Sequence, residues 1–392
     1  MPNENDDQSM HPKRIVIFTG NYNAVADGVA LTLNRLVRYL ERKGNSVLVV
    51  GPSAPNPPFQ HQGTFYPVPS ISLPFSNRKE YRLAIPFSLS TRRKVIDFKP
   101  HLVHVATPDL LGRIALKFAK RFKVPLVASY HTHFASYMEY YGLGAIEDRV
   151  WRYLKSFYDA CLHVYVPSQS MVDVLKAHHI TKGVRLWERG VETAHFSPEK
   201  RDEAWRAQHG IAEDEVVVSF VSRLVWEKGL DVFAAVVKRL EAEGVPHKSL
   251  IVGDGPALDE LKMMLPNTIF TGYQSGNDLT LAYASSDVFL FPSETETFGN
   301  VTLEAMASGI PTVCADATGS RELVLSGETG YLAPPKDHNA FYEATHRLIT
   351  QPDLRLQMGQ AARNRALEYD WETVLAKIER YYDEILFPET VL

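Results

Sequence analysis

Apolar and polar residues follow a pattern along this chain that predicts strands alternating with helices. Short apolar runs, of a length that suits strands buried on both faces, recur between longer segments with helical periodicity. In the first half the predicted strands are residues 14–18, 46–50, 101–105, 125–129 and 162–166. A helix predicted near Leu31–Arg42 separates the first two and ends at Gly44. This order predicts a doubly wound parallel sheet.

The same pattern restarts in the second half of the chain. Its predicted strands are residues 216–221, 250–252, 268–270, 287–291 and 311–313. Regular structure is interrupted between Gly190 and Lys200, where turn-forming residues cluster. We therefore expect an α/β protein with a disordered tail at 1–12, Rossmann-like domains at 13–192 and 193–370, and a final helical segment at 371–392.

Composition is that of a soluble globular protein with room for two cores. The chain has 392 residues, 45% of them hydrophobic and 22% charged. Its two cysteines, Cys161 and Cys314, lie in apolar runs, which argues against a disulfide framework or a structural zinc site. No apolar run has the length of a membrane span, and the first residues are polar and acidic. These features predict a cytoplasmic protein that is neither exported nor integral to a membrane.

Charge divides the chain into two unlike halves. Residues 1–185 hold 24 Lys and Arg against 13 Asp and Glu, whereas the remainder holds 18 against 33. A basic half commonly attracts an anionic partner such as the inner membrane leaflet, although a solvated basic face is equally compatible with the counts. No nucleic-acid-binding module is visible, so we expect no nucleic acid partner.

Two acids in the second half form the most informative motif. Glu296 and Glu304 bracket a Phe298-Gly299 step between a predicted buried strand and a predicted helix. Ligands of open parallel sheets bind beyond the carboxyl ends of the strands. The loop therefore places carboxylates and bare amides where a polyhydroxylated, anionic ligand could be held.

Loops after the first strand of each half have features of phosphate binding. In the first half, Gly28 would let the backbone approach a ligand at a helix N-terminus, although many such turns need a glycine without any ligand. In the second, Arg223 and Lys228 lie five residues apart before a helix, a pairing that suits a diphosphate. An ordinary charged surface loop is the alternative for the second.

Together these motifs resemble the retaining nucleotide-sugar glycosyltransferases of family four, which have the GT-B fold. The resemblance rests on Arg223, Lys228, Gly253-Asp254-Gly255-Pro256, the Glu296 and Glu304 pair, and the segment from Glu304 to Pro311. In the first half, Asp27-Gly28-Val29 and the segment 129–134 look closest to bacterial mannosyltransferases and sulfoquinovosyl lipid synthases. The resemblance implies two Rossmann-like domains facing across a cleft, with the C-terminal helix crossing back to the N-domain.

Roles for individual residues follow from the resemblance. It implies His131, Arg223, Lys228 and Glu296 as catalytic residues. Donor binding adds Gly28, Gly253, Phe298, Gly299, Asn300, Val301 and Glu304, and acceptor binding is expected at Asp27, His133, Tyr137 and Tyr141. A UDP- or GDP-linked sugar is the expected co-substrate, with no cofactor and no metal; the chain has no D-x-D sequence. His131 and His133 suggest a metal site by spacing alone, but no third ligand is evident nearby.

The expected activity is retaining transfer of a sugar to an acceptor hydroxyl of a lipid or glycan. A lipid or lipid-linked acceptor at the cytoplasmic membrane face is implied by the branch that the chain resembles. Aromatic residues between Tyr137 and Tyr158, and cations between Arg78 and Lys94, suit a peripheral membrane surface or, alternatively, a packed core and a solvated face. A nucleotide-sugar epimerase of the same fold and a non-catalytic sugar-binding scaffold are the competing functions.

Overall fold

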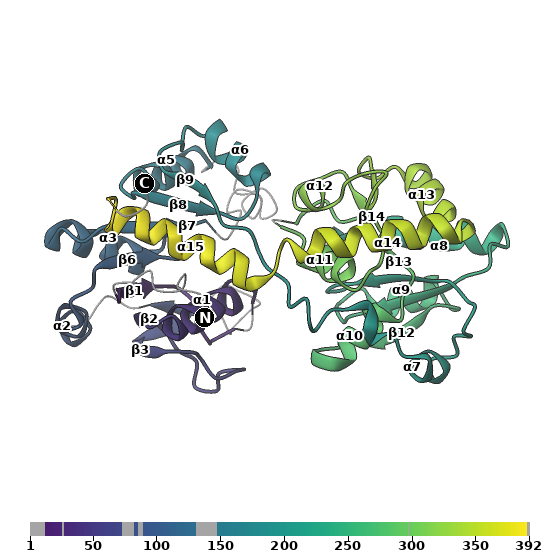
Figure 1. Cartoon of the computed structure of the whole chain (residues 1–392), viewed down its shortest axis with the longest axis horizontal. Coiled ribbons are helices and arrows are strands. Elements are labelled where there is room, and N and C mark those ends of the chain that lie inside the picture. The colour runs from purple at the N-terminus through teal and green to yellow at the C-terminus, as the bar shows by residue number, and fades with distance from the viewer. Residues whose placement is uncertain are drawn as a thin grey trace, which may run out of the picture. The chain divides into compact units, whose positions relative to one another are not determined.

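Contacts within the chain divide it into two units (Figure 1). This computed structural model describes residues 12–25, 27–72, 82–84, 89–130, 147–296 and 298–389. Unit 1 comprises Met1–Pro167, Met171–Trp187 and Leu375–Leu392, and unit 2 comprises Ser168–Ser170 and Glu188–Val374. The last part of the chain therefore belongs to the unit in which the chain begins.

Unit 1 is built on a seven-stranded sheet in the order β3-β2-β1-β6-β7-β8-β9, in which all neighbours pair in parallel. Its strands are β1 (Arg14–Phe18), β2 (Ser46–Pro52), β3 (Thr64–Val68), β6 (Leu102–Val105), β7 (Leu126–Ser129), β8 (His163–Val166) and β9 (Val184–Leu186). A short antiparallel pair, β4 (Ser70–Ser72) and β5 (Arg82–Ala84), lies outside this sheet. The strand order reverses between β1 and β6, the point at which doubly wound sheets bind ligands.

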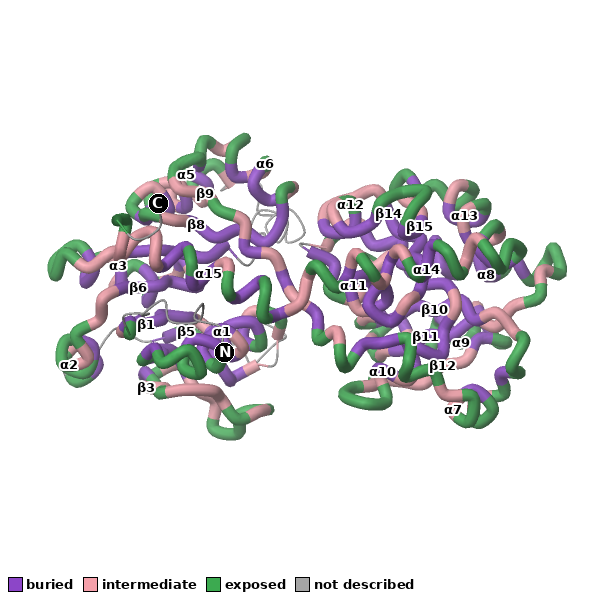
Figure 2. Tube along the Cα trace, viewed as in Figure 1, coloured by how far each residue is buried: buried purple, intermediate pink, exposed green. Residues whose placement is uncertain are grey.

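The helices of unit 1 follow from amphipathic sequence and from capping. They are α1 (Gly28–Arg42), α2 (Leu89–Phe98), α3 (Leu110–Phe122), α5 (Glu147–Tyr158), α6 (Gln169–Ala177) and most of α15 (Trp371–Leu386). Asp27 and Asp109 cap α1 and α3, since each carboxylate accepts a backbone N–H in the first turn. Apolar residues of α2, α3, α5 and α6 join the strands in one buried core (Figure 2).

Helix α15 is attached to unit 1 by buried polar contacts. Lys13 is 1% exposed, and its Nζ lies 2.7 Å from the carboxylate of Asp383 and 3.3 Å from that of Glu379. Glu379 also accepts hydrogen bonds from Tyr39 and Asn45. Removing one member of such a network leaves a buried charge unpaired, so the helix and the start of β1 stabilise each other.

A second buried contact joins α15 to the middle of the sheet. The ring of His104, on β6, is hydrogen-bonded through Nδ1 to Tyr382 Oη at 2.7 Å and through Nε2 to Ser129 Oγ at 2.5 Å. Burial lowers the pKa of His104 to about 3. The imidazole is therefore neutral at physiological pH and links the terminal helix to the end of β7.

Unit 2 is built on a six-stranded parallel sheet in the order β12-β11-β10-β13-β14-β15. Its strands are β10 (Val217–Val221), β11 (Lys248–Val252), β12 (Ile269–Gly272), β13 (Val288–Phe291), β14 (Thr312–Ala315) and β15 (Gly330–Ala333). Its α-helices are α7 (Glu203–Gln208), α8 (Leu230–Ala242), α9 (Leu258–Met264), α10 (Gly276–Ala284), α11 (Asn300–Ala307), α12 (Ser320–Leu323), α13 (His338–Thr350) and α14 (Pro352–Leu367), with 3₁₀ turns η2 (Pro198–Lys200) and η3 (Trp226–Lys228). The strand order reverses between β10 and β13.

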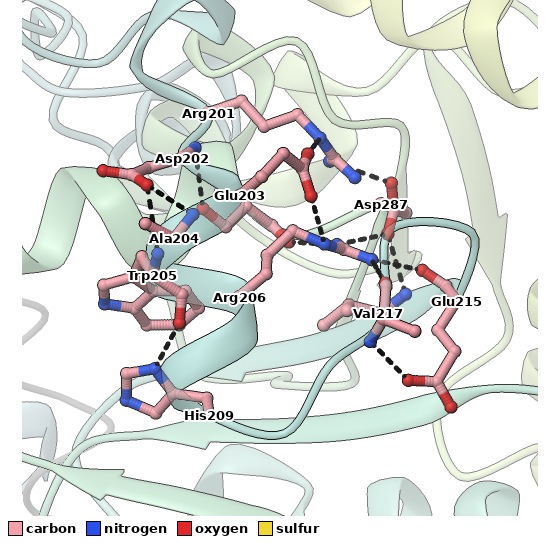
Figure 3. A network of polar contacts seen from close by, with 12 residues as sticks. Arg201, Asp202, Glu203, Ala204, Trp205, Arg206, His209, Glu215, Val217 and Asp287 are labelled. Atoms are coloured by element: carbon pink, nitrogen blue, oxygen red, sulfur yellow. Dashed lines mark hydrogen bonds and ion pairs between the residues drawn. The ribbon is translucent and has the colours of Figure 1, made fainter.

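A buried arginine fixes the amino ends of β10 and β13 (Figure 3). Arg206 is fully buried and donates to the carbonyl oxygens of Ser285, Ala212 and Glu215. It also pairs with Asp287, whose carboxylate accepts the backbone N–H of Val217 at 2.8 Å. Asp287 precedes β13 and Val217 begins β10, so this network holds the two strands side by side.

The two doubly wound sheets confirm the α/β fold class expected from the sequence. Each predicted strand is present, with bounds that agree to within two residues. Strands β3, β9 and β15 were not predicted, because they are short and have partly exposed residues. The aromatic residues Trp151, Phe157 and Tyr158 of α5 pack in the core, which favours the core alternative for them over a membrane surface. Across the described ranges, no helix combines the length and apolar character of a membrane span.

Buried His104 gives a testable dependence of stability on pH. The unfolded chain binds a proton at this imidazole below about pH 6.5, whereas the folded protein does so only near pH 3. Stability is therefore lost as the pH falls between these values, by about 2 kcal/mol between pH 7 and pH 5. Urea unfolding at both pH values should show this difference in the wild type and a smaller one in His104→Gln. Exposed His179→Asn is the matched control and should keep the wild-type difference; an equal difference in His104→Gln would contradict the assignment.

Candidate functional site

The sequence-predicted donor residues of unit 2 gather at the carboxyl ends of its strands. Lys228 follows β10, Gly253 follows β11, and Glu296 follows β13. Because β10 and β13 are neighbours that are not consecutive in the chain, the first and last of these flank the reversal of strand order. A depression of about 680 Å³ that includes Val216 and His247 lies at the opposite edge, and no sequence-predicted site residue lines it.

An ion pair between Lys228 and Glu296 is the centre of the site. Lys228 Nζ lies 2.6 Å from Glu296 Oε1, and the two side chains are 14% and 18% exposed. Ser293 donates a longer bond of 3.4 Å to the same oxygen. No residue in the described ranges bonds to Glu296 Oε2. The pair therefore presents a fixed ammonium group and a carboxylate oxygen that remains able to accept hydroxyl donors.

Arg223 adds a more exposed cation to the same loop. Its side chain is 49% exposed, and its guanidinium pairs with Glu227 at 3.2 Å, four residues further along the chain. Exposed pairs of this kind contribute little to stability. The guanidinium can therefore exchange this partner for an anionic ligand without loss of the fold.

Glu304 is held by a buried tyrosine that no sequence motif indicates. Tyr283, at the end of α10, donates from Oη to Glu304 Oε2 at 3.0 Å, and the same hydroxyl lies 3.3 Å from the carbonyl oxygen of Val301. Burial, and then the charge of Glu304, raises the pKa of Tyr283 well above its usual value. Tyr283 is thus a permanent donor that orients the carboxylate of Glu304.

Two glycines allow the loops of this edge to pack closely. A Cβ at position 253 would lie 1.9 Å from the carbonyl oxygen of Ser222, and Gly253 has φ +145°. A Cβ at position 319 would lie 2.8 Å from the Cβ of Glu296, at φ +87°. Only glycine combines these φ values with such close approach. The loop after β11 therefore packs against the loop after β10, and the loop after β14 packs against the loop after β13.

Residues around the start of α11 offer backbone rather than side-chain groups. The ring of Phe298 is buried and faces Tyr369 with the ring centres 6.0 Å apart. Gly299 has φ +92° and precedes Asn300, the first residue of α11. Amides in the first turn of a helix lack intrahelical acceptors. The backbone N–H groups of four residues therefore remain predicted contacts to the nucleotide-sugar donor: Phe298, Gly299, Asn300 and Val301.

The predicted residues of unit 1 are only partly described. The carboxylate of Asp27 caps α1 through the N–H of Ala30 and also accepts from Asn21 Nδ2. Gly28 begins α1 and is exposed. His131, His133, Tyr137 and Tyr141 lie outside the described residues, so their roles stay predictions. A structural function as a helix cap is therefore established for Asp27, and its acceptor role remains a prediction.

Comparison with known proteins agrees with this geometry. Residues 26–195 match the family model of Glycosyltransferase Family 4, and residues 201–365 match that of Glycosyl transferases group 1. The GDP-mannose-dependent alpha-mannosyltransferase of Mycolicibacterium smegmatis is 34% identical over 379 residues, which cover 95% of this chain and 98% of that protein. The chain belongs to the family 4 glycosyltransferases. This confirms the family resemblance and the hexosyltransferase activity expected from it, and neither an epimerase nor a scaffold is favoured.

One further relative of this family 4 glycosyltransferase and one solved structure are informative. The alpha-monoglucosyldiacylglycerol synthase of Streptococcus pneumoniae is 28% identical over 353 residues, covering 87% of this chain and 79% of that protein. The structure of sucrose-phosphate synthase from Thermosynechococcus elongatus superposes with a TM-score of 0.76 at 21% identity, covering 96% of this chain and all of that one. The latter likeness supports the GT-B fold.

Close packing of Gly319 against Glu296 can be tested with a matched glycine. Gly319→Ala should displace the Glu296 loop, and a shift of about 1 Å in a catalytic group can lower turnover about 100-fold. Gly327 has the same φ of +87°, but no atom lies within 4 Å of where its Cβ would be, so Gly327→Ala carries the backbone strain without the clash. Turnover and thermal unfolding of both variants separate the two effects. Equal turnover in both would show that the close contact does not position Glu296.

Proposed function

We propose that this glycosyltransferase is a retaining, metal-independent enzyme that takes a hexose from a UDP- or GDP-linked donor and transfers it to a hydroxyl of a lipid or lipid-linked acceptor. The observation that carries the proposal is the ion pair of Lys228 and Glu296 at 2.6 Å, where the strand order of unit 2 reverses. It sets a cation for a diphosphate beside a carboxylate for sugar hydroxyls.

Lys228 and Arg223 would act on the leaving group. As the bond between the anomeric carbon and the phosphate oxygen breaks, negative charge grows on the diphosphate. Fixed cations stabilise this charge more strongly in the transition state than in the bound donor, which raises the rate. These two residues would supply the positive charge that a metal ion provides in other reactions with a diphosphate leaving group. The proposal therefore needs no metal.

Glu296 and Glu304 would hold the donor rather than attack it. Glu296 Oε2 would accept a sugar hydroxyl, and Glu304, oriented by Tyr283, would accept ribose hydroxyls. Retention would follow from attack on the same face as the leaving group. The acceptor oxygen bonds to the anomeric carbon, the carbon–oxygen bond to phosphate breaks, and the hydroxyl proton passes to the departing phosphate oxygen.

The lipid acceptor is supported by the relative named for diacylglycerol and by the charge of the first half of the chain. Helix α2 presents the half-exposed to exposed side chains of Arg92, Arg93 and Lys94. Such cations are attracted to anionic headgroups at about 1 kcal/mol each when close to the surface. Peripheral contact of unit 1 with an anionic membrane is part of this proposal.

A donor panel tests the proposed function. The purified protein is incubated with GDP-mannose, UDP-glucose or ADP-glucose and vesicles of a bacterial lipid extract, with and without EDTA. A glycosylated lipid with retained anomeric configuration, formed equally in EDTA, is the expected product. An isomerised donor would identify an epimerase, and donor binding without turnover would identify a scaffold. Loss of product in EDTA would refute metal independence.

Arg223→Ala separates rate from folding. Loss of the guanidinium should lower kcat by about 100-fold or more, because one fewer charge stabilises the leaving diphosphate. Unfolding midpoints should stay close to wild type, since the ion pair that is lost, with Glu227, is exposed. Arg239→Ala is the matched control, because Arg239 forms a similarly exposed pair with Glu243 elsewhere in unit 2. Near-normal turnover of Arg223→Ala would remove Arg223 from the diphosphate role.

A further inference from the structure

Helix α12 is a single turn whose position must be set by its surroundings. It has four residues, Ser320–Leu323, and the first hydrogen-bonded turn of a helix costs more conformational freedom than one hydrogen bond returns. The last carbonyl groups of a helix also lack donors within the helix. This short helix comes directly after Gly319, the residue packed against Glu296. Whatever holds α12 therefore acts next to the predicted donor loop.

Arg365, near the end of α14, supplies the donors that the C-terminus of α12 lacks. Its guanidinium donates from Nε to the carbonyl oxygen of Leu323 and from Nη2 to that of Glu322, both at 2.7 Å. Such bonds are charge-assisted, and a cation is also favoured at the negative end of a helix. The side chain of Arg365 is 22% exposed, so the contact is largely shielded from water. Arg365 therefore fixes the end of α12 on α14.

Helix α12 lies in turn against the segment 296–299. A Cβ at Gly319 would lie 2.8 Å from Cβ of Glu296, and a Cβ at Gly299 would lie 3.3 Å from Cδ1 of Leu323. The side chain of Leu323 is fully buried. The helix thus touches both ends of the segment, one of which carries the carboxylate of Glu296. A movement of α12 would displace that carboxylate.

A second contact of Arg365 leads to the middle of the same segment. Its Nη2 donates to Tyr369 Oη at 3.3 Å. The ring of Tyr369 faces that of Phe298, which is buried, with the ring centres 6.0 Å apart. Arg365 therefore holds two structures, α12 and the ring of Tyr369, that both pack on residues 296–299.

We propose that Arg365 is a positioning residue for sugar transfer: it holds α12 and Tyr369 against residues 296–299 and thereby keeps Glu296 where it binds the donor sugar. The inference rests on the proposed function, which gives Glu296 that role. Arg365 itself contacts no reacting atom in this assignment, because its guanidinium is engaged by oxygen atoms of the protein. Its loss should impair the geometry of the sugar site and leave the diphosphate cations in place.

Arg355 offers a matched comparison on the same helix. It also belongs to α14 and has intermediate burial, and its Nη1 donates to the carbonyl oxygens of Leu348 at 2.8 Å and Ile349 at 3.0 Å, near the end of α13. Ile349 lines the depression at the edge of the sheet opposite the donor loop. Replacing either arginine removes a helix cap, but only Arg365 acts next to the donor loop.

Transfer kinetics test the proposal. Arg365→Ala should lower kcat by about 10- to 100-fold, because a shift of about 1 Å in a group that positions the substrate can cost this much. Affinity for GDP or UDP, measured by calorimetry, should stay within about twofold, since the cations assigned to the diphosphate lie in another loop. Arg355→Ala should keep the wild-type kcat while losing a comparable amount of thermal stability. Arg365→Lys keeps a donor for one carbonyl group and should recover part of kcat, and it carries the comparison if Arg365→Ala does not fold.

Hydrogen exchange tests the positioning without any substrate. In Arg365→Ala, backbone amides in peptides that cover 296–301 and 319–324 should exchange about tenfold faster than in the wild type, because local opening of these segments becomes easier. The same peptides in Arg355→Ala should exchange at the wild-type rate.

Three outcomes would overturn the inference. One is wild-type kcat in folded Arg365→Ala, and another is an equal loss of kcat in Arg355→Ala, which would reduce the role of Arg365 to general stability. The third is a loss of nucleotide affinity as large as the loss of kcat, which would show distortion of the whole edge. If the wild type transferred no sugar, the proposed function would fail, and the role in transfer with it. An active wild type with unchanged exchange in Arg365→Ala would overturn the inference alone.

Discussion

The adjacency of β10 and β13 is the constraint on which the site depends. Lys228 and Glu296 are 68 residues apart in the chain, yet their charged groups lie 2.6 Å apart. They meet because two parallel strands that are not consecutive become neighbours where the strand order reverses, and the loops after them leave the same edge of the sheet. At the other end of these strands, Arg206 and Asp287 bind the start of β13 to the start of β10. A displacement of either strand would break the buried ion pair of Arg206 and Asp287 at the amino ends. It would also separate Lys228 from Glu296 at the carboxyl ends.

Unit 1 shows a different use of buried polar groups. Lys13, Glu379 and Asp383 join the first strand to the last helix, and His104 joins the same helix to β7 through Tyr382 and Ser129. Such groups are costly to bury unless every partner is present, so loss of one partner would destabilise the docking of α15 on unit 1. The helix begins at Trp371 among residues of unit 2 and continues into unit 1. The C-terminal crossing implied by the family resemblance therefore has a physical basis in named contacts of unit 1.

Most of the fold was predictable, and the reason lies in burial. Val288–Phe291 is fully buried, as expected of a parallel strand covered on both faces, and such runs are read directly from sequence. β3 contains Pro67 and partly exposed residues, so it lacks that signature. Lys228, Glu296 and Glu304 could be predicted as site residues because the loops and the helix that carry them come after predicted strands, and their roles stay predictions. Tyr283 and Gly319 were missed, because their importance depends on contacts with Glu304 and Glu296 that arise only from tertiary packing.

The pairing of Lys228 with Glu296 raises the question of how a cation already bound to a carboxylate serves an anionic donor. An ammonium group has three N–H donors, and here one lies 2.6 Å from Glu296 while a longer contact of 3.4 Å reaches Thr295. The carboxylate fixes the direction of the lysine side chain and offsets part of its charge, which limits attraction to the donor in the ground state. In the proposed reaction, the negative charge on the diphosphate increases as its bond to the sugar breaks. A preorganised ammonium group would stabilise this added charge without having to move. In the proposed mechanism, a cation held in this way would favour the transition state over the bound donor, and that difference would accelerate transfer.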